Sequence, residues 1–349
     1  MKNYLIPYAF ITLLFASCSK DDDQPTQPNL ADYEKGVLIS NEGPFNNGSG
    51  TISFVSNDFA TVEHKIYRKV NGSDLGNIVQ SLGFSGSDAY IVVSNSQKIM
   101  IADRYTFEKK DSITSGLENP RYFASNGINQ GYITDWGDPL NDNDDYVAVV
   151  DLRTNTIASV ISVPFGPERM INHGSKIYVA HQGGYGFNNL ISVISGNSVE
   201  STITVGDIPN SMVILGNHLY VLGSGQPDYS GNETSGSITK IDLNSNQVVS
   251  TNTFTSTEHP SSLTTDGTNL YYNLDGKVYK TNANTLSLPG NPIIDGFFYT
   301  MEARNGMLYA TDAGDFASRG KLLVYDLNTN QQIQDIQVGI IPGGIYFNE

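Results

Sequence analysis

Short apolar segments alternate with polar turns along the chain from about residue 36 onward. The clearest segment, Val-Ala-Val-Val-Asp-Leu-Arg-Thr-Asn-Thr at 147–156, recurs at 322–330 and more loosely at 238–246. Each copy is a β-branched or aromatic run that ends in Asp, whose side chain can accept hydrogen bonds from backbone two residues on and so begin a turn. The pattern therefore predicts a repeated strand that is closed by an Asp turn.

A strand with a Leu-Tyr-Val-like core precedes each Asp-ended strand. The seven cores are Val37-Leu-Ile, Tyr90-Ile-Val-Val, Gly131-Tyr-Ile-Thr, Ile177-Tyr-Val-Ala, Leu219-Tyr-Val-Leu, Leu270-Tyr-Tyr-Asn and Leu308-Tyr-Ala-Thr. From Tyr90 onward their tyrosines stand 42, 46, 42, 51 and 38 residues apart, close to the roughly 40 to 50 residues of a four-stranded propeller blade. The spacing predicts an all-β fold, a seven-bladed β-propeller. A two-sheet sandwich or a β-solenoid is the alternative, but sandwiches lack such a long repeat and solenoid coils are shorter.

Prolines mark most of the connections between these units. They are Pro120, Pro167, Pro209, Pro260 and Pro342. Proline suits the crossing from one blade to the next because no ladder donor is needed there. The last segment, 344–348, follows such a crossing but has no blade after it, so we expect it to be the inner strand of the first blade, with the other three strands drawn from 37–70. The propeller then spans 36–349 and closes without an open sheet edge.

The first residues have the features of an export signal. Lys2 precedes an apolar run from Tyr4 to Phe15, which predicts a secretory signal peptide over 1–17. The run is well short of the roughly 20 residues that a membrane-spanning helix needs. Phe15-Ala-Ser-Cys18 resembles the bacterial lipobox, and this resemblance implies cleavage before Cys18 and attachment of lipid there.

Residues 18–35 are predicted to be a lipidated cysteine followed by a disordered acidic tether. The run Ser-Lys-Asp-Asp-Asp at 19–23 resembles the acidic export tag of Bacteroidetes-type lipoproteins. That resemblance implies a lipid-anchored protein on the extracellular face of the outer membrane. The simpler interpretation of the same run is a solvated tether.

Composition narrows the choice of partners. The formal net charge is −16, so nucleic acid and other polyanions are repelled, and contact with a membrane is expected through the lipid anchor alone. A single cysteine excludes an internal disulfide. The ligand is therefore expected to be something other than a polyanion.

One face of the predicted ring collects unusual residues, because the loops between second and third strands open on the same face as the blade crossings. Five of those loops are long, rich in glycine, and place an aromatic residue beside Asn, Asp or Gln. Such a rim suits a large polar organic ligand, although aromatic residues there could also serve only to cover the ends of the core. The candidate ligand-binding residues are Asn41, Glu42, Phe45, Asn77, Gln80, Asn95, Arg121, Tyr122, Asp135, Trp136, Arg169, His181, Tyr185, Phe187, Gln226, Tyr229, His259, Tyr299, Asp312 and Phe316.

Metal and catalytic motifs are weak. Asp142, Asp144 and Asp145 are calcium candidates because calcium prefers several oxygen ligands, but the full EF-hand pattern is missing. The five histidines lack zinc-site spacing, and His181 and His259 are the two that fall on the loop-rich face. No nucleophile elbow, phosphate-binding loop or dinucleotide fingerprint occurs. The sequence therefore predicts a binding protein without a resident cofactor rather than an enzyme.

Several motifs together resemble a known family. They are Asn41-Glu-Gly-Pro-Phe, Asn71-Gly-x-x-Leu-Gly-Asn-x-Val-Gln80, Asn119-Pro-Arg-Tyr, Gly131-Tyr-Ile-Thr-Asp-Trp136 and Val205-Gly-Asp-Ile-Pro. The chain resembles the YncE-like seven-bladed propeller lipoproteins of Bacteroidetes, and within them the BtuG-type surface proteins that capture corrinoids such as vitamin B12. The resemblance implies a lid-like lipoprotein that sits on a TonB-dependent outer-membrane transporter and passes the corrinoid to it. Another bulky cargo, such as a siderophore, haem or glycan, and a propeller lactonase or hydrolase remain as alternatives.

Overall fold

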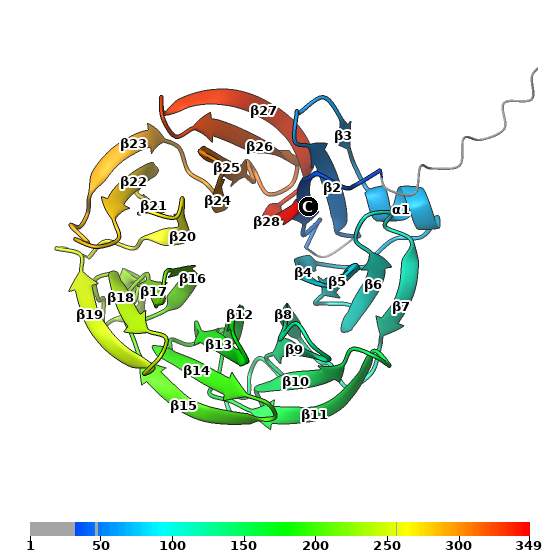
Figure 1. Cartoon of the computed structure of the whole chain (residues 1–349), viewed down its shortest axis with the longest axis horizontal. Helices are drawn as coiled ribbons and strands as arrows, with labels where there is room; N and C mark the ends of the chain where they lie inside the picture. The colour runs from blue at the N-terminus through cyan, green and yellow to red at the C-terminus, as the bar shows by residue number, and fades with distance from the viewer. Residues whose placement is uncertain (1–31, 46–47, 256) are drawn as a thin grey trace, which may run out of the picture.

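Seven four-stranded antiparallel sheets form a closed ring around a central axis (Figure 1). This computed structural model describes residues 32–45, 48–255 and 257–349. The predicted signal peptide at 1–17, Cys18 and most of the predicted tether lie outside the described residues. The all-β, seven-bladed propeller predicted from the repeat is confirmed.

The four strands of each blade take up successive distances from the axis. The inner strands are β28 (Pro342–Asn348), β4 (Val79–Ser85), β8 (Pro120–Ser125), β12 (Pro167–His173), β16 (Pro209–Leu215), β20 (Ser261–Thr265) and β24 (Thr300–Arg304). The second strands are β1 (Gly36–Asn41), β5 (Asp88–Val93), β9 (Gln130–Asp135), β13 (Lys176–His181), β17 (His218–Gly223), β21 (Asn269–Leu274) and β25 (Met307–Asp312). The third strands are β2 (Thr51–Ser56), β6 (Lys98–Asp103), β10 (Tyr146–Asp151), β14 (Leu190–Ser195), β18 (Ser237–Asp242), β22 (Lys277–Asn282) and β26 (Arg319–Asp326). The outer strands are β3 (Val62–Glu63), β7 (Lys109–Ile113), β11 (Thr156–Ser162), β15 (Ser198–Thr204), β19 (Gln247–Thr253), β23 (Asn291–Asp295) and β27 (Gln331–Ile340).

The core lies between the blades. The second strands carry near-continuous apolar runs, because a strand covered by a neighbouring sheet on each face must be apolar on both. Seven buried clusters result, and each joins two adjacent blades. In one of them Tyr90 of β5 stacks on Phe123 of β8, with ring centroids 4.0 Å apart and an interplanar angle of 4°.

The Asp turns form as predicted, at the ends of the third strands. The carboxylates of Asp103, Asp151, Asp242 and Asp326 each accept hydrogen bonds from backbone N–H groups two or three residues on. These turns lie at the end of the ring away from the long loops. The repeated segment at 147–156 therefore belongs to the scaffold.

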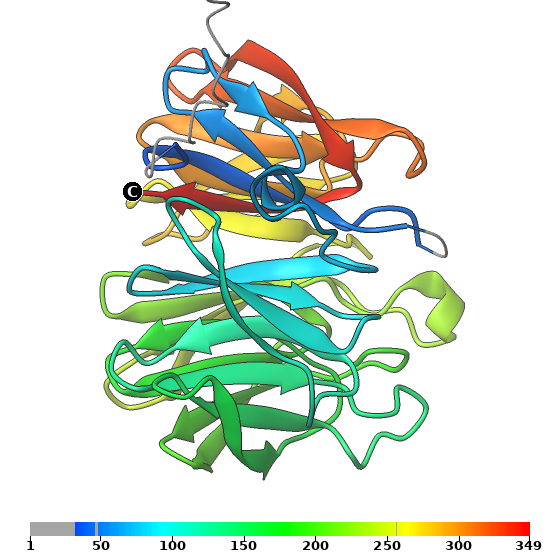
Figure 2. The ribbon, with the colours of Figure 1, turned by 90° about the vertical axis from the view of Figure 1, so that its right-hand side faces the viewer.

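The crossing prolines also stand where the pattern puts them. Pro120, Pro167, Pro209 and Pro342 are the first residues of inner strands, and Pro260 immediately precedes β20. Because neighbouring strands are antiparallel, the second strand of a blade ends where the inner strand begins. The longer loops, which follow the second strands, project from this end of the ring, on the right in Figure 2. We call this end the loop face, and the other end the opposite face.

The ring closes as predicted, with β28 paired to β1. The first blade differs in its outer part, because β3 has only two residues and α1 (Ile66–Asn71) follows it. Ile66 and Tyr67 of α1 are buried in the cluster between the first and second blades. The helix therefore covers the outer part of the first blade, where the other blades have a longer outer strand. One other short helix, η1 (Asp228–Ser230), lies in a loop-face connection. No helix within the described part of the chain is long and apolar enough to cross a membrane.

Asn348 links the closing strand β28 to neighbouring segments by hydrogen bonds, and its substitution tests how much the closure stabilises the ring. Its buried Nδ2 donates to the carbonyls of Tyr33 and Arg104, at 2.6 and 2.7 Å, and its Oδ1 accepts from Arg104 Nε at 2.7 Å. We predict that Asn348→Ala lowers the free energy of unfolding by about 2–4 kcal/mol, because buried polar groups lose their partners. Denaturant unfolding measures the change.

The control for this substitution is Asn328→Ala, in an exposed turn of the last blade. It should change the free energy of unfolding by no more than about 0.5 kcal/mol. Equal effects of the two substitutions would contradict a special role for Asn348 in closure.

Candidate functional site

Exposed aromatic side chains gather on the loop face. Every exposed Phe, Tyr or Trp among the described residues lies in a second-to-third-strand loop or a blade crossing at this end of the ring. They are Phe45, Tyr185, Tyr229, Phe297, Tyr299 and Phe316. Folding alone would favour burying such residues, so their concentration at one end marks a contact surface.

The aromatic side chains interact in pairs around the rim. Trp136 and Tyr185 have centroids 6.3 Å apart and link the third blade to the fourth, and Phe187 and Tyr229, also 6.3 Å apart, link the fourth to the fifth. Tyr299 packs edge-to-face on Phe316 at 5.6 Å. Pairing of this kind restricts the rings and preserves their exposed faces for a ligand.

A polar cavity of about 230 Å³ opens inside this rim, at the mouth of the central channel. Its lining residues come from crossings, from inner strands and from the beginnings of two second-to-third-strand loops. They are Glu42, Gln80, Arg121, Tyr122, Glu168, Arg169, Gln182, Asn210, Ser261, Ser262, Tyr299 and Gly343. We call this cavity the funnel.

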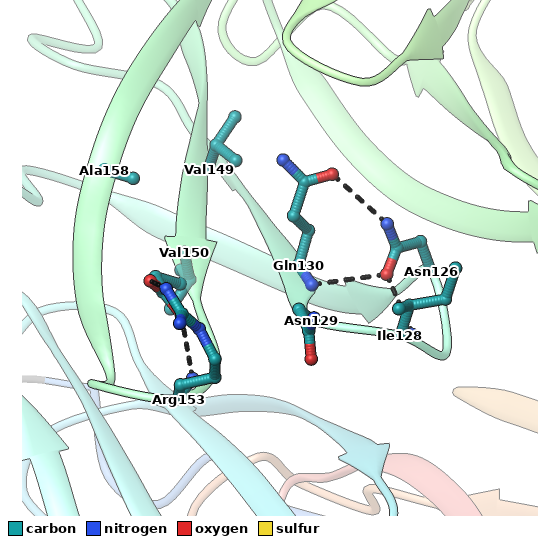
Figure 3. A pocket seen from close by; sticks show the side chains of 9 residues that line it. Asn126, Ile128, Asn129, Gln130, Val149, Val150, Arg153 and Ala158 are labelled. Atoms are coloured by element: carbon teal, nitrogen blue, oxygen red, sulfur yellow. Dashed lines mark hydrogen bonds and ion pairs between the residues drawn. The ribbon is translucent and has the colours of Figure 1, made fainter.

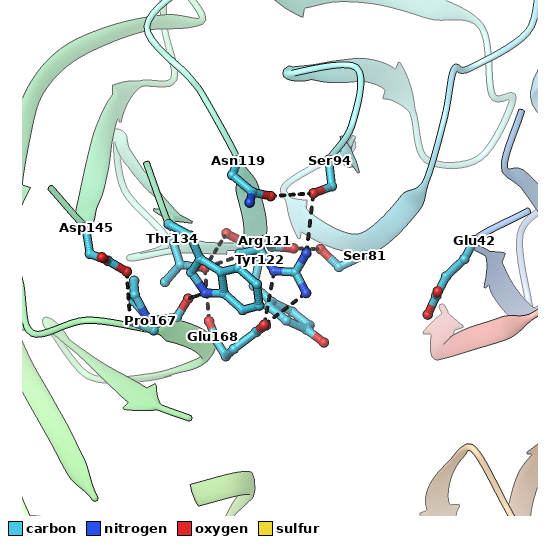
Figure 4. A network of polar contacts seen from close by, with 12 residues as sticks. Glu42, Ser81, Ser94, Asn119, Arg121, Tyr122, Thr134, Asp145, Pro167 and Glu168 are labelled. Atoms are coloured by element: carbon cyan, nitrogen blue, oxygen red, sulfur yellow. Dashed lines mark hydrogen bonds and ion pairs between the residues drawn. The ribbon is translucent and has the colours of Figure 1, made fainter. Parts of the chain in front are cut away.

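Arg121 is fixed at one side of the funnel (Figure 4). Its Nη2 lies 2.9 Å from Glu168 Oε1, its Nε donates to the same oxygen at 3.0 Å, and its guanidinium lies over the Trp136 ring at 4.1 Å. Trp136 in turn donates its Nε1–H to the carbonyl of Pro167. Burial favours the neutral form of Arg121, but Glu168, Tyr122 and Glu42 together outweigh burial and raise the pKa of Arg121. The result is a rigid cationic and aromatic wall that needs no ligand to keep its shape.

Glu42 and Tyr299 form another part of the wall, next to the closure of the ring. Tyr299 donates its hydroxyl to Glu42 Oε1 at 2.9 Å. Partial burial raises the pKa of Glu42, while the Tyr299 hydroxyl and the charge of Arg121 oppose the rise. A glutamate side chain in either protonation state can accept a hydrogen bond from a ligand amide or hydroxyl.

Charged groups continue into the channel below the funnel. Arg169 lies over the Tyr122 ring, 5.3 Å from its centroid. Further in, Glu302 accepts from the Thr264 hydroxyl at 3.2 Å. Burial raises the pKa of Glu302 to about 7, against the opposing charge of Arg169 and the hydrogen bond from Thr264. Arg169, Thr264 and Glu302 thus make this part of the channel wall polar.

Three sequence-predicted ligand contacts are wrong, because Asn41, Asp135 and His181 are 0% exposed. Asp135 accepts hydrogen bonds from three backbone N–H groups that shape its own loop and the preceding crossing. Asn41 accepts from the Gly339 N–H across the closure of the ring and donates within its own blade. All three are strand-end residues that point between sheets.

His181 also cannot approach a metal at the loop face. Its Nε2 lies 2.8 Å from Ser192 Oγ on the neighbouring strand. Burial lowers the pKa of His181 to about 4, so the ring is neutral at physiological pH. The other loop-face histidine, His259, is partly exposed, with Nδ1 2.8 Å from the Ser224 carbonyl oxygen and Nε2 3.2 Å from Glu233.

Four other predicted residues support loops. Asn77 donates to the carbonyls of Pro44 and Gly48, and Asn95 donates to Asn77 Oδ1 at 2.8 Å. Gln226, in the loop that carries Tyr229, donates to Asp207 in the crossing between β15 and β16. Asp312 accepts from the backbone N–H two residues on. These side chains hold the aromatic loops in place and lie outside the funnel.

The acidic loop does not gather into a metal cluster. Asp145 accepts the Gly166 N–H at 2.7 Å, and Asp144 accepts the Asp138 N–H at 3.3 Å. Among the described residues, no group of three or more His, Cys, Asp or Glu side chains could hold a metal ion. The carboxylates of Asp144 and Asp145 instead accept backbone hydrogen bonds that shape the loop beside Trp136.

Four of the funnel residues that are missing from the list of candidate ligand-binding residues are identified by a simple signal. Glu168, Asn210, Ser261 and Gly343 each directly follow a crossing proline, as Arg121 does. The residue after each crossing proline occupies the same place in its blade and faces the mouth of the channel. Phe297 was also missed. It is exposed and its neighbour Phe298 is buried, and two adjacent phenylalanines give no sign in the sequence of which one faces solvent.

A second hollow, of about 440 Å³, lies at the opposite-face end of the third blade (Figure 3). Its polar side chains bond to one another: Asn126 donates to Gln130 Oε1 at 3.2 Å, and Arg153 pairs with Asp151 at 2.7 Å. With these groups already paired, the loop face remains the better candidate site.

Comparisons with solved structures support the fold alone. A functionally unknown protein from Desulfotomaculum acetoxidans DSM 771 has a TM-score of 0.63 at 12% identity, with 90% of this chain and 98% of that chain covered. Dihydro-heme d1 dehydrogenase NirN in complex with DHE has a TM-score of 0.60 at 13% identity, covering 93% and 77%. The computationally designed Ika8 protein has a TM-score of 0.58 at 12% identity, covering 90% and 93%.

No curated protein matches this sequence. A family model described as "Domain of unknown function (DUF5074)" matches residues 35–339, which is nearly the whole propeller. The chain therefore belongs to the DUF5074 family and folds as a seven-bladed β-propeller.

Proposed function

We propose that this protein is a surface-exposed outer-membrane lipoprotein that binds a corrinoid on its loop face and delivers it to a TonB-dependent transporter. One observation carries the proposal: every exposed aromatic side chain among the described residues belongs to the end of the ring where the polar funnel opens. The resemblance to BtuG-type propellers supplies the identity of the ligand. The lipobox-like Cys18 supplies the anchor.

The chemistry of the face matches that of a corrinoid. A corrinoid is a large, largely apolar disc fringed with amides. Aromatic rings such as Tyr185 and Tyr229 offer flat contact area, while Gln80, Asn210 and Arg121 offer the amide and guanidinium partners that a fringe of amides requires. Binding of this kind needs no ligand to the cobalt.

A different bulky cargo is the second candidate, because a siderophore, haem or glycan would also present a large surface to the same rim. Catalysis fits the site less well. Glu168 is committed to Arg121, Glu42 accepts from Tyr299, and His181 is sealed in the core. We therefore propose a binding protein rather than a hydrolase or lactonase.

Titration with cyanocobalamin tests the ligand. We expect a saturable heat of binding, with a shift in the visible spectrum of the corrinoid as it enters the loop face. The absence of both signals at micromolar protein, with the protein folded by circular dichroism, would reject a corrinoid. Ligand mass spectrometry on protein taken from culture would then identify the alternative cargo.

Substitution of the rim aromatics tests the place of binding. Tyr185 and Tyr229 are 78% and 85% exposed, so Tyr185→Ala and Tyr229→Ala should each weaken corrinoid binding by about 1–3 kcal/mol through lost ring contact. Calorimetry gives both values. The matched control is Ile128→Ala, since Ile128 is 76% exposed on the opposite face, and it should leave affinity unchanged. A loss confined to Ile128→Ala would move the site to the other end of the ring.

Replacement of Cys18 tests the anchor. Wild-type protein should carry the mass of a lipid and partition into detergent, because acyl chains have a large apolar surface that enters detergent micelles. Cys18→Ser should lose both properties and appear in the aqueous phase, whereas Ser19→Ala should retain them. Intact-protein mass spectrometry decides the matter, and an unlipidated wild-type protein would refute the anchor.

A further inference from the structure

A separate cavity of about 480 Å³ lies where the first and last blades meet. Its walls come from the loop between β1 and β2, from the loop-face ends of β2 and β26, from the connection between β3 and α1, and from the end of β27. Figure 1 shows these blades side by side at the point where the ring closes. We call this cavity the seam pocket, and it shares no lining residue with the funnel.

The charge of the seam pocket is opposite to that of the protein. His64, Lys65 and Arg319 line it, and none of its described lining residues is an Asp or Glu. The chain as a whole has 36 acidic and 20 basic residues. In so acidic a protein, a hollow with two cations and no carboxylate has a local field that attracts anions.

Two of the basic groups, Arg319 and His64, have neutral partners. Arg319 donates its Nε–H to the carbonyl of Val338 at 2.8 Å, a bond that does not use the terminal nitrogens of the guanidinium. His64 Nδ1 lies 3.5 Å from Ser53 Oγ, and burial together with the charge of Arg319 lowers the pKa of His64. A neutral imidazole beside a guanidinium can still donate one hydrogen bond to an anion.

The rest of the lining suits an oxyanion on a small organic body. Thr51 supplies a hydroxyl that can donate to an anion, whereas the Ser49 hydroxyl is already bonded to Gly50 and Gly76. Ile340 and Pro44 add apolar surface. Guanidinium and ammonium groups form their strongest hydrogen bonds with phosphate and carboxylate oxygens. The volume exceeds that of an inorganic ion, so the pocket has room for a remainder attached to the anionic group.

We infer that the seam pocket binds a phosphate or carboxylate group of a small organic anion between Lys65 and Arg319. Such a ligand contacts the first and the last blade at once, and binding to the folded state alone stabilises that state. An anion there would therefore reinforce the closure of the ring. The inference is independent of the corrinoid proposal, because it concerns different residues.

Phosphate and acetate are the probes, each titrated against sodium chloride of matched ionic strength. We expect phosphate or acetate to raise the thermal midpoint of the wild-type protein to a plateau, with a dissociation constant that calorimetry confirms. Arg319→Gln should weaken that binding by about tenfold or more, because a charge-assisted hydrogen bond is lost. Arg319→Lys, which keeps the charge, should weaken it less.

The matched control is Lys98→Gln. Lys98 is the first residue of β6, the third strand of the second blade, and Arg319 is the first residue of β26, the third strand of the last blade. Lys98 therefore has the equivalent position in another blade, and it lies outside the seam pocket. Removal of this charge should leave the affinity for the probe unchanged. A midpoint that rises no further than in chloride, or equal losses in Lys98→Gln and Arg319→Gln, would overturn the site. Should Arg319→Gln fail to fold, Lys65→Gln takes its place under the same criteria.

Discussion

Face-to-face packing between neighbouring sheets is the interaction on which the whole molecule depends, because the core of each blade is completed by its neighbour. Seven buried clusters, one for each contact between adjacent blades, account for the apolar second strands and for pairs such as Tyr90 and Phe123. A sheet that lost its neighbour would expose one entire apolar face. The ring is therefore stable as a closed set, and stability does not depend on the long loops at its end.

That division leaves the loop face available for binding. Arg121, Glu168 and Trp136 fix one another, so the funnel wall is organised before any ligand arrives. A site that is already ordered loses less conformational entropy on binding. The exposed aromatics around it add contact area without being needed for the fold. Scaffold and site thus use different residues of the same repeat.

The repeat was readable from sequence because every blade must satisfy the same local rules. Asp turns and crossing prolines act within a few residues of the chain, and both were found where predicted. The fate of strand-end residues was harder to foresee. Asn41, Asp135 and His181 are the last residues of second strands and are buried. The residue that follows each of them lies in a loop and can face solvent, so a shift of one residue changes the predicted exposure. Helix α1 was missed as well, since its burial depends on packing against the second blade rather than on its own short sequence.

The closing strand also imposes an order on synthesis. Within the ring β1 is made first, yet its partner β28 follows all the other strands of the propeller, and Asn348 and Tyr33 are separated by 315 residues. Until that strand arrives, a nascent chain carries an unpaired inner edge on β1 and an uncovered apolar face on each terminal sheet. Unpaired edges of this kind invite pairing with other chains. The propeller is therefore open to premature association until all of its other strands are made, and the seven residues of β28 end that exposure.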